Sequence, residues 1–303
     1  MPYAFPHISV AIPTCNRSED IQRYLDSLVK VVYPNWDILL VDQSDDERTR
    51  TVVEHFTESL PQLTYKRIDE KGTARARNIG IEATSGEIVA YLDDDCTVKP
   101  DWLKQVADAF ERHPKVALVF GNVASAPYDP REFFVPVYPV KREHIIRSPW
   151  AFARPDGMGA SMYLRRTVWQ QVGPFDVCLG PGSRWYWGGE DNDYIYRCLV
   201  SGFDVMRTPA IAVEHYGARS YENGGATRLF VGNAQCAAAI DMKLMRCGHP
   251  IALLVMASHS AYFVLEIFRR GPRSINQLLA YVRSLYGSFE LGVDRRRGLF
   301  VQR

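Results

Sequence analysis

Residues 87–95 are Glu-Ile-Val-Ala-Tyr-Leu-Asp-Asp-Asp, an apolar run that ends in three consecutive carboxylates. A short apolar run of this kind is typical of a buried strand, and parallel α/β sheets place their ligand-binding residues where such strands end. Adjacent carboxylates repel one another unless a divalent cation lies among them. Mg²⁺ and Mn²⁺ are hard cations that prefer oxygen ligands and keep positions open for phosphate. We therefore expect a strand over 87–92 and a cation site at Asp93, Asp94 and Asp95, with a solvated acidic turn as the alternative.

Strand-like and helical stretches alternate on both sides of this motif. Apolar residues at helical spacing mark the helices, and Ser18 is the expected N-cap of the first one. Such alternation predicts βαβ crossovers and a mostly parallel sheet with helices on both faces, which is an α/β, Rossmann-like architecture. The expected strands cover 7–13, 36–42, 63–68, 87–92 and 116–120, and the expected helices cover 18–31, 49–60, 74–84 and 101–112.

The alternation stops near residue 125. Prolines at six positions predict a long irregular connection over 125–157, and connections of this length are often functional. We expect the chain to divide into a body over 1–217 and a helical extension over 218–303. The later expected elements are a strand over 157–166, a strand ending at His215, and helices over 167–172, 190–201, 225–246 and 250–268.

Composition and charge exclude some classes of protein. The 303 residues are 47% hydrophobic, which provides enough apolar material for a packed core. The net charge of +1 argues against a general nucleic-acid binder, because such proteins need a basic excess. The charge is uneven, with −6 over 1–215 and +7 over 216–303. A basic segment can face an anionic surface, and a solvated helical face is the alternative.

The apolar stretch 250–268 is bounded by Arg269 and Arg270 and contains Ser258, His259, Ser260 and Glu266. It is near the lower length limit for a membrane span. We expect first a buried or dimer-interface helix, so that a homo-oligomer is one interpretation. An interfacial membrane helix comes second, and a true span comes last.

The six cysteines show neither a C-x-x-C pair nor zinc-type spacing, and the N-terminus lacks the pattern of a signal peptide. We expect reduced thiols and a cytoplasmic location, with peripheral association at the inner face of the cell membrane.

Other polar residues fall at the ends of the expected strands. Thr14, Asn16 and Arg17 follow the first strand, and Asp42 ends the second. Asp42 could accept a hydrogen bond from a base imide, and basic side chains could neutralise phosphates. Taken singly, each is more often a surface or capping residue, but they coincide on one sheet edge. The polar residues before and within the third helix are Lys71, Arg75, Arg77 and Asn78.

A second group of candidate catalytic residues begins at Gly188-Gly189-Glu190-Asp191. Acidic residues at a helix start satisfy capping and the helix dipole, which is the structural interpretation. Trp185 and Trp187 precede them and offer apolar faces for a sugar ring. A carboxylate beside such faces is a reasonable general base. His215 could complete a metal site, although a single histidine at a strand end is more often structural.

Four motifs, in their order along the chain, resemble those of the family 2 glycosyltransferases. They are IPTCNR (12–17), LLVDQSDD (39–46), GTARARNIGIEATSGEIVAYLDDD (72–95) and GGEDNDYIYR (188–197). The resemblance covers about 7–217 and implies the GT-A fold and an inverting, metal-dependent transfer from a nucleoside-diphosphate sugar. It departs after Cys15, where the usual aromatic before Asn16 is missing.

The resemblance also implies roles for individual residues. Asp191 would be the catalytic base. Asp93 and Asp95 would be the DXD residues, with Asp93 near the ribose and metal and Asp95 on the metal. His215 would add a metal or diphosphate contact. The cofactor is expected to be Mn²⁺ or Mg²⁺. The residues expected to bind the nucleotide are Thr14, Arg17, Asp42, Arg75, Asn78, Asp93 and Asp94.

The expected donor is a UDP- or dTDP-sugar, and the expected acceptor is a hydroxyl of a glycan or a lipid-linked molecule in cell-surface polysaccharide synthesis. Two alternatives stay open. A nucleotidyltransferase would share an Asp-rich metal site, but it should carry a Gly-rich basic loop after the first strand, where this chain has PTCNR. A non-catalytic scaffold that binds sugar nucleotides should have lost Asp191 or the triple Asp.

Overall fold

The computed structural model describes residues 5–150, 157–271 and 274–302. Its centre is a mixed, mostly parallel sheet with the strand order β3-β2-β1-β4-β9-β6-β10-β5, and β8 pairs with β10 at its side. The strands of this sheet are β1 Ile8–Thr14, β2 Trp36–Asp42, β3 Leu63–Arg67, β4 Ile88–Tyr91, β5 Cys96–Val98, β6 Val116–Ser125, β8 His144–Ile146, β9 Met162–Arg165 and β10 Asp204–His215. The expected α/β architecture is confirmed.

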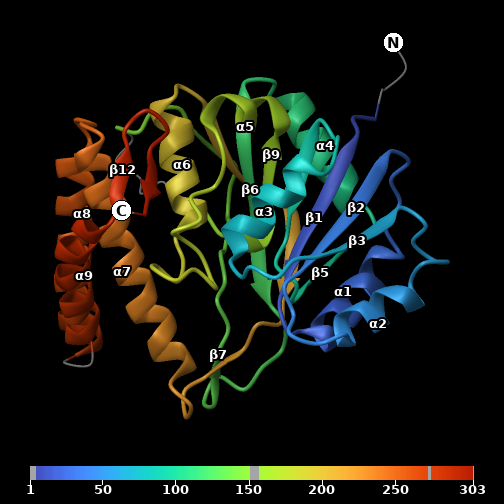
Figure 1. The fold of residues 1–303 in the computed structure, drawn as a ribbon, viewed down its shortest axis with the longest axis horizontal. Coiled ribbons are helices and arrows are strands. Elements are labelled where there is room, and N and C mark those ends of the chain that lie inside the picture. The colour runs from blue at the N-terminus through green and yellow to red at the C-terminus, as the bar shows by residue number, and fades with distance from the viewer. Residues whose placement is uncertain (1–4, 151–156, 272–273, 303) are drawn as a thin grey trace.

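Helices cover both faces of the sheet (Figure 1). Alternate residues of β1 point to opposite faces, so Val10 and Ile12 join one apolar core and Ala11 joins the other. The first core packs α1, α2 and α4, and the second packs α3, α5 and α6. These helices are α1 Ser18–Leu28, α2 Arg48–His55, α3 Thr73–Glu82, α4 Trp102–Arg112, α5 Arg166–Val172 and α6 Glu190–Val200.

A helical extension follows the sheet. Figure 1 shows α7 beside α6, with α8 and α9 farther from the sheet. The three helices contact one another. Its elements are α7 Gly225–Arg246, α8 Ala252–Arg270, α9 Ile275–Gly287, the 3-10 turn η3 Ser288–Glu290, and the hairpin of β12 Gly292–Asp294 and β13 Leu299–Val301. The remaining short elements are β7 Phe133–Phe134, β11 Arg219–Ser220 and the 3-10 turn η1 Gly159–Ser161.

Several local predictions are wrong in detail. The N-cap of α1 is Arg17, not Ser18, and it makes no side-chain capping bond because a guanidinium has no acceptor for the helix N–H groups. Helix α2 ends at His55 rather than near residue 60. Strand β6 continues to Ser125 because β10 pairs with it along its whole length. The connection after β6 carries the short strands β7 and β8, and its residues 151–156 lie outside the described part of the chain.

Candidate active site

The first part of the site lies where β1 and β4 end side by side. These strands pair in parallel, so the residues that follow them meet at one edge of the sheet. Thr14 Oγ1 donates to Asp94 Oδ2 at 2.7 Å. Arg17 Nη1 donates to Asp94 Oδ1 at 2.9 Å and to Asp95 Oδ2 at 2.5 Å. The structure therefore brings four of the predicted site residues into direct contact.

His215 ends β10 and faces the same carboxylates. Its Nε2 lies 3.0 Å from Asp95 Oδ1. Its Nδ1 lies 2.9 Å from the Pro136 carbonyl oxygen, which can only accept, so Nδ1 carries a hydrogen. Burial acts against a charge on His215, but the close contact with the negatively charged Asp95 raises the pKa of His215. Burial likewise opposes the charge of Asp95, yet His215 and Arg17 hold the pKa of that carboxyl below its usual value.

The same residues fit a divalent cation. Asp95 Oδ1 is buried and accepts no hydrogen bond of good geometry, although His215 Nε2 lies nearby. One ligand atom each of Asp95, Cys96 and His215 lie within 4.8 Å of one another. Burial raises the pKa of the Cys96 thiol well above its usual value, so it stays protonated and suits a hard cation poorly. The residues that would hold Mn²⁺ or Mg²⁺ are therefore Asp95 and His215, with Asp93 beside them.

Asp94 has a different environment from its neighbour. Burial is the largest effect on the pKa of Asp94 and raises it. Arg17 opposes this and Asp95 adds to it by repulsion, and the resulting pKa is about 7. A cation that displaces Arg17 from the two carboxylates would balance their negative charge in its place.

Gly217 allows close packing against Asp95 and His215. A Cβ at this position would contact Asp95 Oδ2 and lie 2.7 Å from His215 Nε2. A larger residue would therefore displace the Asp95 and His215 side chains.

Arg77 joins this part of the site to the second one. Its side chain is 1% exposed, and it lies 2.7 Å from Glu190 Oε1 and 3.3 Å from Asp93 Oδ1. Arg77 was expected among the side chains that neutralise phosphate. That interpretation is wrong, because its guanidinium is buried between two carboxylates.

Asp191 lies in the first turn of α6, next to Glu190. Gly189 enters this helix in the left-handed region, with φ 79°, which a glycine adopts without strain. The Gly159 N–H donates to Asp191 Oδ2 at 2.9 Å, and the Asn192 N–H donates to Oδ1 at 2.7 Å. Burial raises the pKa of Asp191 despite Arg77 and these two donors. Burial also raises the pKa of Glu190, to about 7. Asp191 is thus a fixed carboxylate with increased basicity.

The structure places three other predicted residues apart from the carboxylate cluster. Asp42 lies opposite Thr14 in the register of β1 and β2, but it is fully buried and accepts from the Tyr65 hydroxyl at 2.7 Å. Asn78 exchanges two hydrogen bonds with the backbone of Phe175. Arg75 pairs with Glu70.

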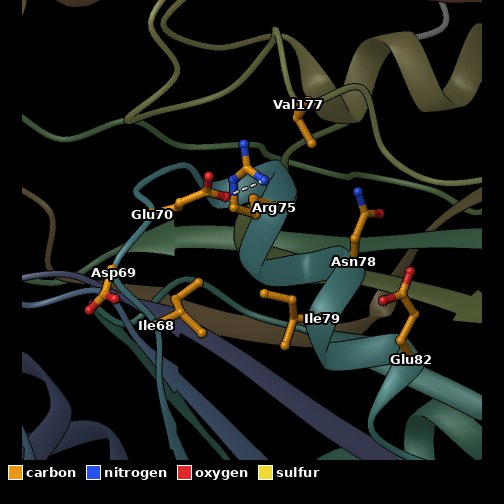
Figure 2. A pocket seen from close by; sticks show the side chains of 8 residues that line it. All are labelled: Ile68, Asp69, Glu70, Arg75, Asn78, Ile79, Glu82 and Val177. Carbon is orange, nitrogen blue, oxygen red and sulfur yellow. Dashed lines mark ion pairs between the residues drawn. The ribbon is translucent and has the colours of Figure 1, made fainter.

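Arg75 and Asn78 instead line a hollow of about 520 Å³ on the outer side of α3 (Figure 2). Three carboxylates share this hollow with the single arginine, which is a poor environment for a diphosphate. The triple Asp and Asp191 are not among its lining residues, so we do not assign the hollow to catalysis. Its lining residues are Ile68, Asp69, Glu70, Arg75, Asn78, Ile79, Glu82 and Val177.

Sequence reasoning missed a buried charge network behind α6. Lys243 of α7 lies 2.6 Å from Asp176 Oδ2 and 2.5 Å from Asp193 Oδ1, and Arg197 Nε lies 2.9 Å from Asp193 Oδ2. All four side chains are nearly inaccessible to water. A single lysine in the Ala-rich stretch 225–246 was the only signal for it. The network ties α6 to the extension, and the Phe300 N–H also donates to Asp176.

The sheet order, the carboxylates at its edge and the helix that carries Glu190 and Asp191 define a glycosyltransferase of the GT-A type. The family model described as glycosyl transferase family 2 matches residues 9–173, and the chain belongs to that family. The resemblance stated from the motifs is confirmed.

Individual relatives agree with this assignment. The chain is 28% identical to glycosyltransferase AglE of Haloferax volcanii, over 68% of this chain and 67% of that protein. It is 33% identical to the UDP-Glc:alpha-D-GlcNAc-diphosphoundecaprenol beta-1,3-glucosyltransferase WfgD of Escherichia coli, over 29% of this chain and 34% of that one. The mannosyltransferase PcManGT from Pyrobaculum calidifontis, solved with GDP-Man and Mn²⁺, shares the fold with a TM-score of 0.62 at 19% identity, over 96% of this chain and 77% of that chain.

Proposed function

We propose that this protein transfers a sugar from a nucleoside-diphosphate sugar to a hydroxyl of a glycan or lipid-linked acceptor, with inversion at the anomeric carbon and dependence on a divalent cation. The observation that carries the proposal is the position of Arg77 between Asp93 and Glu190. This contact places the carboxylates that would hold the cation near Asp191, the candidate base, which follows Glu190 in α6. A single displacement requires both groups in one site.

Asp191 is suited to the role of general base. Its carboxylate is held by two backbone N–H groups and has a raised pKa, so it can accept the proton of an acceptor hydroxyl as that oxygen attacks the anomeric carbon. One displacement from the face opposite the diphosphate inverts the configuration, and no nucleophilic side chain is needed. A cation bound at Asp95 and His215 would offset the charge that develops on the leaving diphosphate.

The partners follow from the same chemistry. Thr14, Arg17 and Asp94 lie at the edge where a nucleotide would bind beside the cation. Trp185 and Trp187 are 36% and 49% exposed just before α6, which supports an acceptor sugar stacking near Asp191. WfgD carries a UDP-sugar and a lipid-linked acceptor in its name, and PcManGT was solved with a GDP-sugar. We retain UDP- or dTDP-sugars as the favoured donors. For Asp42, Arg75 and Asn78, nucleotide contact stays a prediction that needs a side-chain rearrangement.

Thermal stabilisation by nucleoside diphosphates tests the donor site. We expect UDP or dTDP to raise the melting temperature only when Mn²⁺ is present, because a cation held by Asp95 and His215 would offset the negative charge of the diphosphate. A ligand at 100 times its Kd adds about 2.7 kcal/mol, which a melting curve resolves easily. GDP, ADP and Mn²⁺ alone are the controls.

A shift with GDP alone would overturn the choice of donor and keep the enzyme class. No shift with any nucleotide would contradict the proposed function and favour the scaffold hypothesis. Transfer of a nucleotidyl group would be detected as incorporation of labelled nucleoside monophosphate, and family membership leads us to expect none.

Binding of Mn²⁺ itself should depend on pH. His215 must release its Nε2 proton to bind a cation, and its pKa is raised, so affinity should increase as the pH rises through that pKa. Below it we expect affinity to fall by about tenfold per pH unit for each proton released. Calorimetry in buffers of different ionisation enthalpy measures the proton count. His215→Gln should lower that count by one, and an unchanged count would remove His215 from the ligand set.

A further inference from the structure

Helices α8 and α9 lie beyond α7, far from the sheet (Figure 1), and both carry many exposed apolar side chains. Its most exposed members are Phe268 at 82%, Tyr286 at 74% and Leu253 at 69%. Exposed apolar clusters of this kind mark interaction sites in folded proteins. We call the following residues the apolar face: Leu253, Leu254, Val264, Leu265 and Phe268 of α8, Ile275, Leu279, Val282 and Tyr286 of α9, and Phe289 of η3.

The opposite side of α8 is packed against protein. Val255, Phe263 and Glu266 of this helix are buried. Asp241 of α7, fully buried, lies 2.9 Å from His259 Nδ1 of α8 and accepts from the Tyr281 hydroxyl of α9 at 2.7 Å. One carboxylate therefore links α7 to both helices that carry the apolar face.

This arrangement argues against a true membrane span for the stretch 250–268. The window Ala252–Arg269 is long and apolar enough to cross a membrane, and only 22% of it is buried. A spanning helix would have to leave α7, break the His259–Asp241 contact and bring His259 and Glu266 into hydrocarbon, at high energy. A helix that packs one side on protein and exposes the other is suited to lie in an interface.

Exposed basic residues lie on the same helices as the apolar face and in the hairpin that follows them. Arg269 is 71% exposed at the end of α8, and Arg283 is exposed on α9. Arg295, Arg296 and Arg297 are exposed in the turn between β12 and β13. Among the described residues of 216–303, the exposed carboxylates are Glu222 and Glu290.

We propose that the apolar face docks the protein onto an anionic lipid membrane, with its aromatic and aliphatic side chains in the interfacial region and its arginines on lipid phosphates. Charge complementarity selects this occupant. The extension carries +7 and the rest of the chain −6, so an anionic surface attracts the side with the apolar face and repels the other. A symmetric pair of copies would place the same arginine-rich rims near each other, which is unfavourable. This proposal does not rest on the sugar-transfer chemistry.

Vesicle flotation of the full chain tests the proposal. We expect binding to phosphatidylcholine vesicles that contain phosphatidylglycerol, weaker binding to pure phosphatidylcholine, and release at high salt. The double variant Leu265→Glu with Phe268→Glu should lose binding by at least tenfold. Arg283→Glu should weaken it by about fivefold or more, as expected for the loss of one basic contact. Val32→Glu is the matched control, because Val32 is 75% exposed outside the apolar face.

Melting temperature and the nucleotide-induced shift are recorded for each variant, so that a folding defect or a failed donor site is distinguished from a docking defect. Three outcomes would overturn the proposal. The first is failure of the wild-type protein to bind anionic vesicles at low salt. The second is unchanged binding by the variant that carries both glutamates. The third is a dimer in sedimentation that the same variant converts to monomers, which would assign the face to a second copy.

Discussion

Replacing Asp191 with asparagine is expected to reduce sugar transfer by about 10²- to 10⁴-fold, the usual contribution of a positioned general base. The amide keeps the size of the side chain and one acceptor for the Gly159 and Asn192 N–H groups, but it cannot take a proton. Since the base acts on the acceptor hydroxyl, donor binding should stay within a factor of a few of the wild type. Initial rates of sugar incorporation and nucleotide titrations measure the two effects separately.

Asp95→Asn provides the contrast. It removes a charge from the cation site next to His215, so it should weaken Mn²⁺-dependent nucleotide binding as well as transfer. The pH dependence of the wild-type enzyme adds a second check. Because burial raises the pKa of Asp191, activity should fall as the pH drops through that value and the base becomes protonated. Normal transfer by Asp191→Asn would show that another group is the base.

Replacing Lys243 with methionine is expected to destabilise the protein by about 3–5 kcal/mol, because it leaves Asp176 and Asp193 buried without their shared cation. Methionine retains most of the side-chain length, so a packing defect contributes little. The free energy of unfolding from urea denaturation measures the effect. We expect it to loosen the contact between α6 and α7, and hence the position of Asp191.

Two variants isolate the electrostatic part of this effect. Lys104→Met removes an exposed lysine that pairs with Asp108, and it should change stability by less than about 1 kcal/mol. Adding Asp176→Asn to Lys243→Met restores the charge balance of the network, so it should recover part of the lost stability. If the two lysine replacements destabilise equally, the buried network is not what holds α7 to the body.

Local sequence patterns predicted the elements of the sheet well. The second strand and the helix over 225–246 were predicted at their observed bounds, Trp36–Asp42 and Gly225–Arg246. Both stretches have strong, regular apolar patterns that fix the backbone without distant partners. Helix α9 and the terminal hairpin were not predicted. Helix α9 is stabilised by burying Ala280 and Tyr281 in the extension, and local spacing does not reveal such packing.

Some features of the candidate site were predictable from the sequence and others were not. Strand ends meet at one edge of a parallel sheet, so the order of strands was enough to predict that Thr14, Arg17 and the triple Asp lie together. It was not enough for the tautomer of His215, which depends on the Pro136 carbonyl 79 residues away. Nor was it enough for Asp42, whose carboxylate accepts a hydrogen bond from the Tyr65 hydroxyl.

The sequence by itself determined the α/β architecture, the family and the types of residue at the candidate catalytic edge, because these follow from periodicity and from motifs read along the chain. The tertiary structure alone decided what each charge does. Arg77 and Glu190 are 113 residues apart, yet their pairing makes Arg77 a buried bridge rather than a phosphate ligand. The same holds for Lys243 in the buried network and for the exposed side of α8. A charge or an apolar side chain acquires its role from the groups that surround it, and folding brings those groups from distant parts of the chain.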